Sequence, residues 1–190
     1  MHLNLTDPRL IAAAVVVVLL ILVGVALVLQ KRRKKTEALR LRYGSEYDRA
    51  VRTQGSEQKA EAQLAGRETR VENLKIRELG ATERGRFLSD WSTVQSRFVD
   101  HPKGAVTEAD ELVSALMQAR GYPVADFEQR AADVSVNHPR LVEYYRSAHA
   151  VAVRVGRGEA STEELRNAMI QYRSLFDELV QAPAENRSVA

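Results

Sequence analysis

The hydrophobic and polar positions of the chain follow three successive patterns. The first is a run of twenty residues without a charge at positions 10–29, LIAAAVVVVLLILVGVALVL. A helix of that length spans roughly 30 Å, the thickness of the hydrocarbon core of a bilayer. At that depth a helix is required, because backbone N–H and C=O groups have no water to bond. The pattern predicts a transmembrane helix at residues 10–29.

Residues 30–79 form the second pattern, in which charges are many and apolar spacing is thin. Leu39, Tyr43 and Tyr47 recur every four residues and would share one face of a helix. Residues 58–76 are expected to form one exposed helix with a narrow apolar seam, made of Ala60, Leu64, Val71 and Leu74 and interrupted by Arg67. We interpret this part as a charged, helical juxtamembrane linker. Its sequence leaves open whether it lies on the membrane surface or packs on the rest of the chain.

Five apolar stripes with a helical period form the third pattern, between residues 82 and 181. They are Phe87, Trp91, Val94 and Phe98; Val106, Ala109, Val113 and Leu116; Val124, Phe127, Ala131 and Val134; Leu141, Tyr145, Ala148, Ala152 and Val155; and Leu165, Met169, Tyr172, Phe176 and Leu179. The connections between them are short, so neighbouring helices should run antiparallel. The predicted fold class is all-α, with an antiparallel helical bundle at 82–181 and a disordered tail at 182–190.

Local signals mark where these helices should start and stop. His101-Pro102 and His138-Pro139 predict two helix starts, because a proline in the first turn lacks only an N–H that would have no partner there. Ser161 and Glu164 form a predicted capping box. Gly121-Tyr122-Pro123 predicts the end of one helix and the start of the next. The segment 120–130 could line a binding groove, although a tight corner between helices needs the same residues.

The net charge of +3 is unevenly distributed along the chain. Residues 31–42 hold seven cations against Glu37, whereas residues 43–190 hold 20 basic and 23 acidic residues. Nucleic acid is therefore not an expected partner, because its binding needs a basic face. The cations that directly follow the apolar run are Lys31, Arg32, Arg33, Lys34 and Lys35, which we call the basic collar.

The basic collar predicts the side of the membrane on which the chain lies. Lys and Arg next to a span stay preferentially in the cytoplasm. We expect a single-pass plasma-membrane protein with residues 1–9 outside and the bundle in the cytoplasm. The collar should contact anionic headgroups, at about 1 kcal/mol per cation. The alternative is secretion after signal-peptide cleavage near Gly24-x-Ala26, which would leave the collar close to the new N-terminus and resist translocation.

Few residues of the chain suggest chemistry. Without cysteine it has no disulfide, catalytic thiolate or thiolate metal site. None of its four histidines pairs with another at i, i+4, and no phosphate loop, dinucleotide fingerprint or nucleophile elbow is present. Glu108, Asp110 and Glu111 are expected in the first turn of a helix, where carboxylates favour the helix dipole. We predict no catalytic residue, no cofactor and no metal site.

Four segments of the sequence show a resemblance. "LRYGSEYDRAV", "RFVDHPKGAVTEADELV", "RGYPVADFEQRAADVSV" and "GEASTEELRNAMIQYRSLFDEL" together resemble an uncharacterised family of bacterial single-pass membrane-anchored proteins with a C-terminal helical domain. The resemblance covers nearly everything after the basic collar. It implies a bacterial origin and no assigned activity, so no functional residue is carried over from it.

Two hypotheses of function follow from these patterns. The first is a non-enzymatic, membrane-tethered helical interaction or scaffold module that binds an unidentified protein partner. The second is an enzyme or small-ligand binder with a pocket between the bundle helices. Its candidate residues combine aromatic rings with polar groups on core-forming segments: Trp91, Tyr144, Tyr145, His149 and Tyr172.

Overall fold

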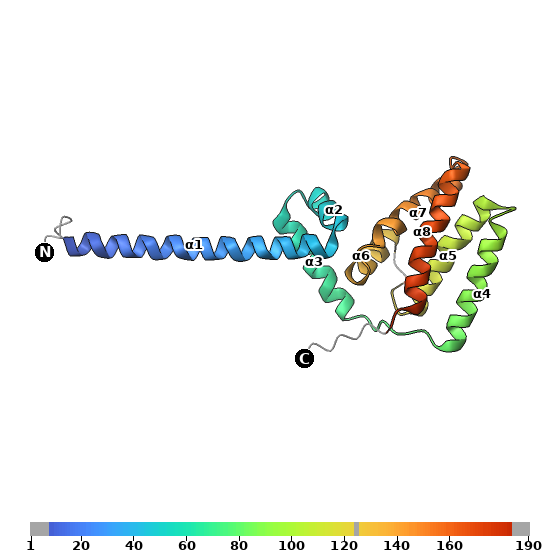
Figure 1. The fold of residues 1–190 in the computed structure, drawn as a ribbon, viewed down its shortest axis with the longest axis horizontal. Helices are drawn as coiled ribbons and strands as arrows, with labels where there is room; N and C mark the ends of the chain where they lie inside the picture. The colour runs from blue at the N-terminus through green and yellow to red at the C-terminus, as the bar shows by residue number, and fades with distance from the viewer. Residues whose placement is uncertain (1–7, 124–125, 184–190) are drawn as a thin grey trace. The chain divides into compact units, whose positions relative to one another are not determined.

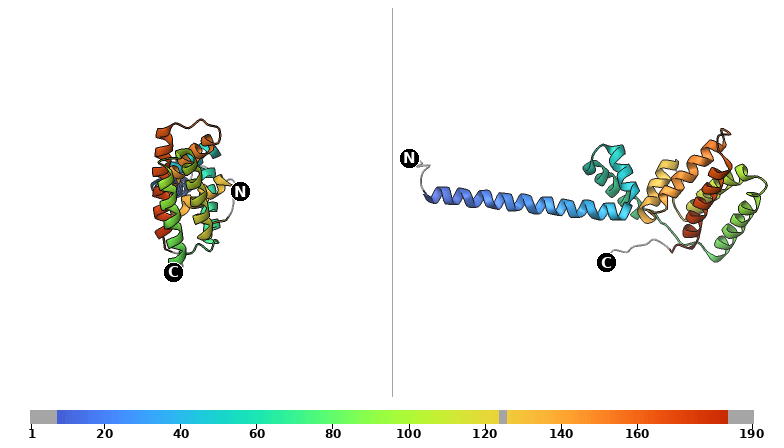
Figure 2. Two further views of the ribbon diagram at one scale, coloured as in Figure 1. Left: turned by 90° about the vertical axis from the view of Figure 1, so that its right-hand side faces the viewer. Right: turned by 45° about the horizontal axis from the view of Figure 1, so that its top comes forward.

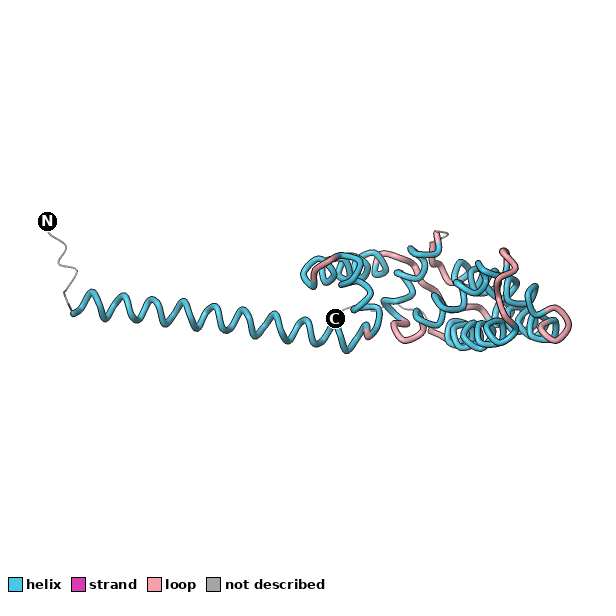
Figure 3. The backbone as a smooth tube through the Cα atoms, turned by 90° about the horizontal axis from the view of Figure 1, so that it is seen from above, coloured by secondary structure: helices cyan, strands magenta, loops and turns pink. Residues whose placement is uncertain are grey.

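The computed structural model describes residues 8–123 and 126–183, with side chains from Val16 onward. These residues form eight α-helices and no strand, which confirms the all-α fold class (Figures 1 and 3). The helices are α1 (Pro8–Tyr43), α2 (Ser45–Gln54), α3 (Glu57–Glu72), α4 (Ala81–Arg97), α5 (Pro102–Ala119), α6 (Phe127–Asn137), α7 (Val142–Val155) and α8 (Thr162–Gln181). The predicted residue Val124, residues 1–7 and the tail from 184 lie outside the described part.

The chain divides into two compact units, Met1–Arg42 and Tyr43–Ala190. The first consists of α1, which runs without a break from Pro8. Its twelve large apolar side chains between Val16 and Leu29 are each 51–66% exposed. Among the described residues, no helix combines the length and the apolar character that a membrane crossing requires. The predicted span 10–29 begins within residues 8–15, whose side chains are outside the described part.

The second unit is a helical bundle, as predicted. Helices α4, α5, α7 and α8 pack side by side, with α8 against both α5 and α7 (Figure 2). The predicted stripes form its core: Val106, Ala109, Val113 and Leu116 of α5 and Leu165, Tyr172, Phe176 and Leu179 of α8 are each at most 2% exposed. The helical spacing of the apolar residues therefore identified the buried face of the described part of each stripe.

The second unit begins at Tyr43 rather than at residue 82. Helices α2 and α3 pack on each other and contact α7 and α6, respectively. We call residues 43–72 the α2–α3 hairpin. This stretch of the predicted linker therefore packs on the bundle. Its apolar pattern is thin because two charged residues, Glu46 and Arg67, take up buried positions that apolar residues usually occupy.

Most of the predicted helix ends match the structure. Ser161 and Glu164 form the capping box, with the Glu164 carboxylate accepting from the Ser161 N–H at 2.9 Å. Pro102 is the first residue of α5. The second proline prediction was wrong: Pro139 lies in a turn, and α7 begins at Val142. In that turn the Leu141 N–H donates to the His138 carbonyl, which delays the helix start.

The C-terminal end of α5 packs against the 73–80 segment, and this contact depends on Arg120 and Gly121. Arg120 is fully buried and donates hydrogen bonds to the carbonyls of Arg77, Leu179 and Pro183. Gly121 has a φ of +100°, and a Cβ atom there would lie 2.4 Å from the Lys75 carbonyl oxygen. Only glycine fits this position, because it combines a left-handed backbone with close contact to another segment.

We predict that Gly121→Ala lowers the free energy of unfolding by at least about 2 kcal/mol, since it adds backbone strain and a clash with Lys75. Gly158→Ala is the matched control, because Gly158 is also left-handed (φ +77°) but has open space around its Cβ position. It should cost about 1 kcal/mol. Denaturant unfolding of the full chain, followed by the fluorescence of its single tryptophan, measures both. Equal losses would contradict the clash.

Candidate functional site

Three of the five predicted pocket residues meet around a carboxylate that the sequence analysis assigned to a helix dipole. The hydroxyl of Tyr172 (α8) donates to Asp110 Oδ1 at 2.7 Å, and His149 Nδ1 (α7) lies 3.1 Å from the same oxygen. Phe127 stacks on the His149 ring at 3.7 Å and packs against Tyr145 at 4.9 Å between ring centroids. We call these residues the Asp110 cluster. Asp110 lies in the middle of α5, not in its first turn, so the earlier assignment was wrong.

Protonation within the Asp110 cluster follows from burial and hydrogen bonding. Burial acts to raise the pKa of Asp110, but hydrogen bonds from His149 and Tyr172 outweigh it and lower the pKa. Burial, together with the charge of Asp110, raises the pKa of Tyr172. At neutral pH the cluster therefore holds a carboxylate and a protonated phenol. The phenol donates to the carboxylate and not to the imidazole, which differs from the arrangement of a nucleophile activated by a histidine.

The other two predicted pocket residues lie elsewhere. Trp91 (α4) stacks on Phe176 with ring centroids 4.7 Å apart, within the main core. Tyr144 is 46% exposed and lines a groove of about 480 Å³ between α7 and α8. The five residues are thus distributed over three places, and they do not assemble as one site.

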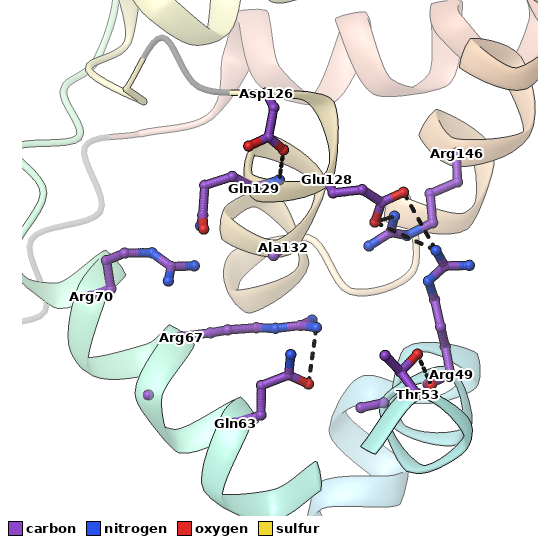
Figure 4. A pocket seen from close by; sticks show the side chains of 12 residues that line it. Arg49, Thr53, Gln63, Arg67, Arg70, Asp126, Glu128, Gln129, Ala132 and Arg146 are labelled. Carbon is purple, nitrogen blue, oxygen red and sulfur yellow. Dashed lines mark hydrogen bonds and ion pairs between the residues drawn. The ribbon is translucent and has the colours of Figure 1, made fainter. Parts of the chain in front are cut away.

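The pocket that the sequence analysis missed lies between the α2–α3 hairpin and helices α6 and α7. It has a volume of about 610 Å³. Its lining contains four arginines, two carboxylates and several uncharged residues: Arg49, Arg67, Arg70, Arg146, Asp126, Glu128, Ala50, Thr53, Gln63, Gly66, Gln129 and Ala132 (Figure 4). We call it the arginine pocket. One signal was present in the sequence, since Gln63, Arg67 and Arg70 share one face of α3 at i, i+4 and i+7.

Behind this pocket, one buried carboxylate joins three helices. Glu46 of α2 is 2% exposed and accepts from Arg67 of α3 at 2.7 Å and from Arg146 of α7 at 3.2 Å. Arg67 also donates to the Ser135 hydroxyl of α6 at 3.4 Å. Arg67 therefore does not interrupt the apolar seam of α3 but adds a buried ion pair to it. A buried charge of this kind depends on its partners, because removing one leaves the other unpaired away from water.

A second buried carboxylate joins α3 to α6. Asp133 is fully buried, and its Oδ1 accepts from Arg70 Nε at 2.8 Å and from Gln129 Nε2 at 2.9 Å. At the rim, Glu128 lies between Arg146 and Arg49. Burial acts to raise the pKa of Glu128, but the hydrogen bonds and charges of these arginines outweigh it and lower the pKa. Glu128 is thus ionised at neutral pH.

No group of three or more His, Asp or Glu side chains in the described part of the chain is arranged to hold a metal ion. The predicted membrane-surface residues Lys31, Arg32, Arg33, Lys34 and Lys35 belong to the first unit, where all five are exposed along α1. Besides α1, the described residues offer three places to consider for function: the Asp110 cluster, the groove between α7 and α8, and the arginine pocket.

Comparison of the chain with protein-family models, curated proteins and solved structures finds no match. Its function is therefore inferred from its own sequence and geometry.

The lowered pKa of Asp110 predicts how the free energy of unfolding depends on pH. A depressed carboxyl pKa adds stability above the unfolded value of 3.8, and that stability is lost as pH falls through the lower folded value. Asp110→Asn should therefore lower the free energy of unfolding by roughly 1–3 kcal/mol at pH 7. The exposed Asp90→Asn is the control and should change it little. Denaturant unfolding from pH 7 to pH 3 measures both, and a deficit for Asp110→Asn that grows in acid would contradict the assignment.

Proposed function

We propose that this chain is a membrane-tethered interaction module, with a helical bundle held at the cytoplasmic face of a bacterial plasma membrane to bind a protein partner. One observation carries the proposal. On the single uninterrupted helix α1, exposed apolar side chains up to Leu29 are followed, after Gln30, by the cations 31–35.

The apolar part of α1 supports a hydrocarbon environment. In water each of its twelve large exposed side chains costs on the order of 1 kcal/mol. Apolar side chains occupy every side of this helix, so a partner packed on one face would still leave the others in water. The full run of twenty uncharged residues from position 10 has the length of a membrane span.

The distribution of charge supports the orientation. Seven cations fall within the twelve residues after the run, whereas the residues before it contain Arg9 and Asp7, which cancel. This asymmetry favours the N-terminus outside and the bundle inside. Cleavage near Ala26 is the competing arrangement, and the collar disfavours it because five cations next to a new N-terminus resist export.

The bundle itself supports binding to a protein. The groove between α7 and α8 is bordered by Tyr144 and Ile170, which are 46% and 55% exposed. Arg154 and Glu164 form an ion pair at one side of it. Exposed apolar side chains with polar residues beside them are typical of a protein-binding surface. The Asp110 cluster does not favour an enzyme instead, because its phenol and imidazole both face the same carboxylate.

Site-specific crosslinking in cells tests this proposal. A photoreactive residue in place of Ile170 should give a discrete crosslinked product, identified by mass spectrometry. The same residue in place of Val99, which is 83% exposed and outside that groove, is the matched control. A chain truncated after residue 42 controls for contacts of the anchor. Identical product patterns at positions 170 and 99, or none above the truncated chain, would contradict partner binding through this groove.

A further inference from the structure

The arginine pocket lies where the α2–α3 hairpin meets α6 and α7, and the hairpin is held there by a different kind of contact than the main core. Most buried apolar residues of the α2–α3 hairpin lie outside the main core: Tyr43, Tyr47, Ala50, Ala60 and Leu64. Val71, at the C-terminal end of the hairpin, belongs to that core. Toward α6 and α7 the hairpin makes ion pairs instead, Arg70 with Asp133 of α6 and Glu46 with Arg146 of α7. Ligand sites occur preferentially at such junctions, where two packed parts meet without interdigitating.

The inner surface of the pocket is rich in hydrogen-bond donors. A guanidinium carries five N–H donors and no acceptor. Arg70 uses its Nε and one terminal nitrogen on Asp133, and Arg49 uses one terminal nitrogen on Glu128, while both side chains remain 40–50% exposed. In Figure 4 the head groups of Arg67 and Arg70 point into the same space, near the amides of Gln63 and Gln129.

The lining also contains more positively than negatively charged side chains. Four arginines line the pocket against two carboxylates, Asp126 and Glu128. The carboxylates of Glu46 and Asp133, which pair with Arg67 and Arg70, are buried behind the lining and outside it. A molecule that enters the pocket therefore meets guanidinium donors from α2, α3 and α7 at once. The complementary ligand has several acceptor oxygens and negative charge, because arginine pairs best with carboxylates and phosphates.

We propose that the arginine pocket binds a small anion that carries phosphate or carboxylate groups. Its volume of about 610 Å³ lies within the usual range for small-molecule sites. Such a ligand contacts Arg49 and Arg70 of the hairpin and Arg146 of α7 together, so it clamps the hairpin to the bundle. The proposal goes beyond partner binding, because it makes the attachment of the hairpin to the bundle respond to a small ligand. It does not depend on the identity of the partner or on membrane insertion.

Calorimetry with the full chain in non-ionic detergent tests the site, with inorganic phosphate and citrate as probes at ionic strength matched by sodium chloride. We expect saturable binding of at least one probe and slower hydrogen exchange in α3. Arg49→Gln should weaken binding at least tenfold, because Arg49 supplies a charged donor yet pairs only loosely with exposed Glu128. Arg166→Gln is the control: Arg166 is an exposed arginine of α8 that pairs with an exposed glutamate, Glu163, and its loss should leave binding within twofold of the wild type.

A second variant protects the test from misfolding. Arg70→Gln combined with Asp133→Asn removes the Arg70 charge without leaving a buried carboxylate unpaired, and it too should weaken binding at least tenfold. Nanodiscs with and without phosphatidic acid then separate the two sources of the anion. Loss of probe binding with phosphatidic acid present identifies a lipid headgroup as the ligand, whereas unchanged binding identifies a soluble anion. No saturable binding of either probe, or equal affinity in wild type, Arg49→Gln and the double variant, would overturn the proposal.

Discussion

The exposure of apolar side chains on every side of α1 is the constraint on which the proposed arrangement of the chain depends. Val16 to Leu29 contribute twelve large apolar side chains that are half exposed, followed by cations on the same helix. Water disfavours such a helix, and a bilayer removes the penalty. Within the bilayer the helix makes all of its backbone hydrogen bonds internally. The proposed membrane anchor follows from this requirement, and the proposed orientation follows from the cations after it.

The bundle combines an ordinary apolar core with charged joints. Its core forms where α5 and α8 pack, and there the side chains are apolar apart from Asp110 and its hydrogen-bond partners. At the joints, buried charges replace apolar contacts: Glu46 connects three helices, and Arg120 binds carbonyls of the 73–80 segment and of the C-terminal end of α8. Each such group is costly unless its partners are in place, because removing one partner leaves a charge unpaired away from water. The hairpin is therefore the part of the bundle whose attachment most depends on charge.

The sequence predicted the buried positions of the apolar residues but not those of the charged residues. Apolar residues such as Val113 and Phe176 repeat with the helical period, which identifies their buried face without knowledge of a partner. A buried charge has no such signal. Arg67 looked like an interruption because its carboxylate partner, Glu46, is on another helix. The hydrogen bonds of Asp110 were missed because His149 and Tyr172 approach it only after folding. The arginine pocket was missed for the same reason, since its lining comes from four helices.

Cysteine accessibility tests the central claim most directly, because the chain has no cysteine of its own. Single substitutions Asn4→Cys and Ser188→Cys place one thiol on each side of the proposed span. In spheroplasts, a membrane-impermeant maleimide should label Asn4→Cys at once and Ser188→Cys only after the membrane is permeabilised. Labelling of Ser188→Cys in intact spheroplasts, or recovery of the chain in the soluble fraction, would contradict a cytoplasmic bundle held by a membrane-spanning α1.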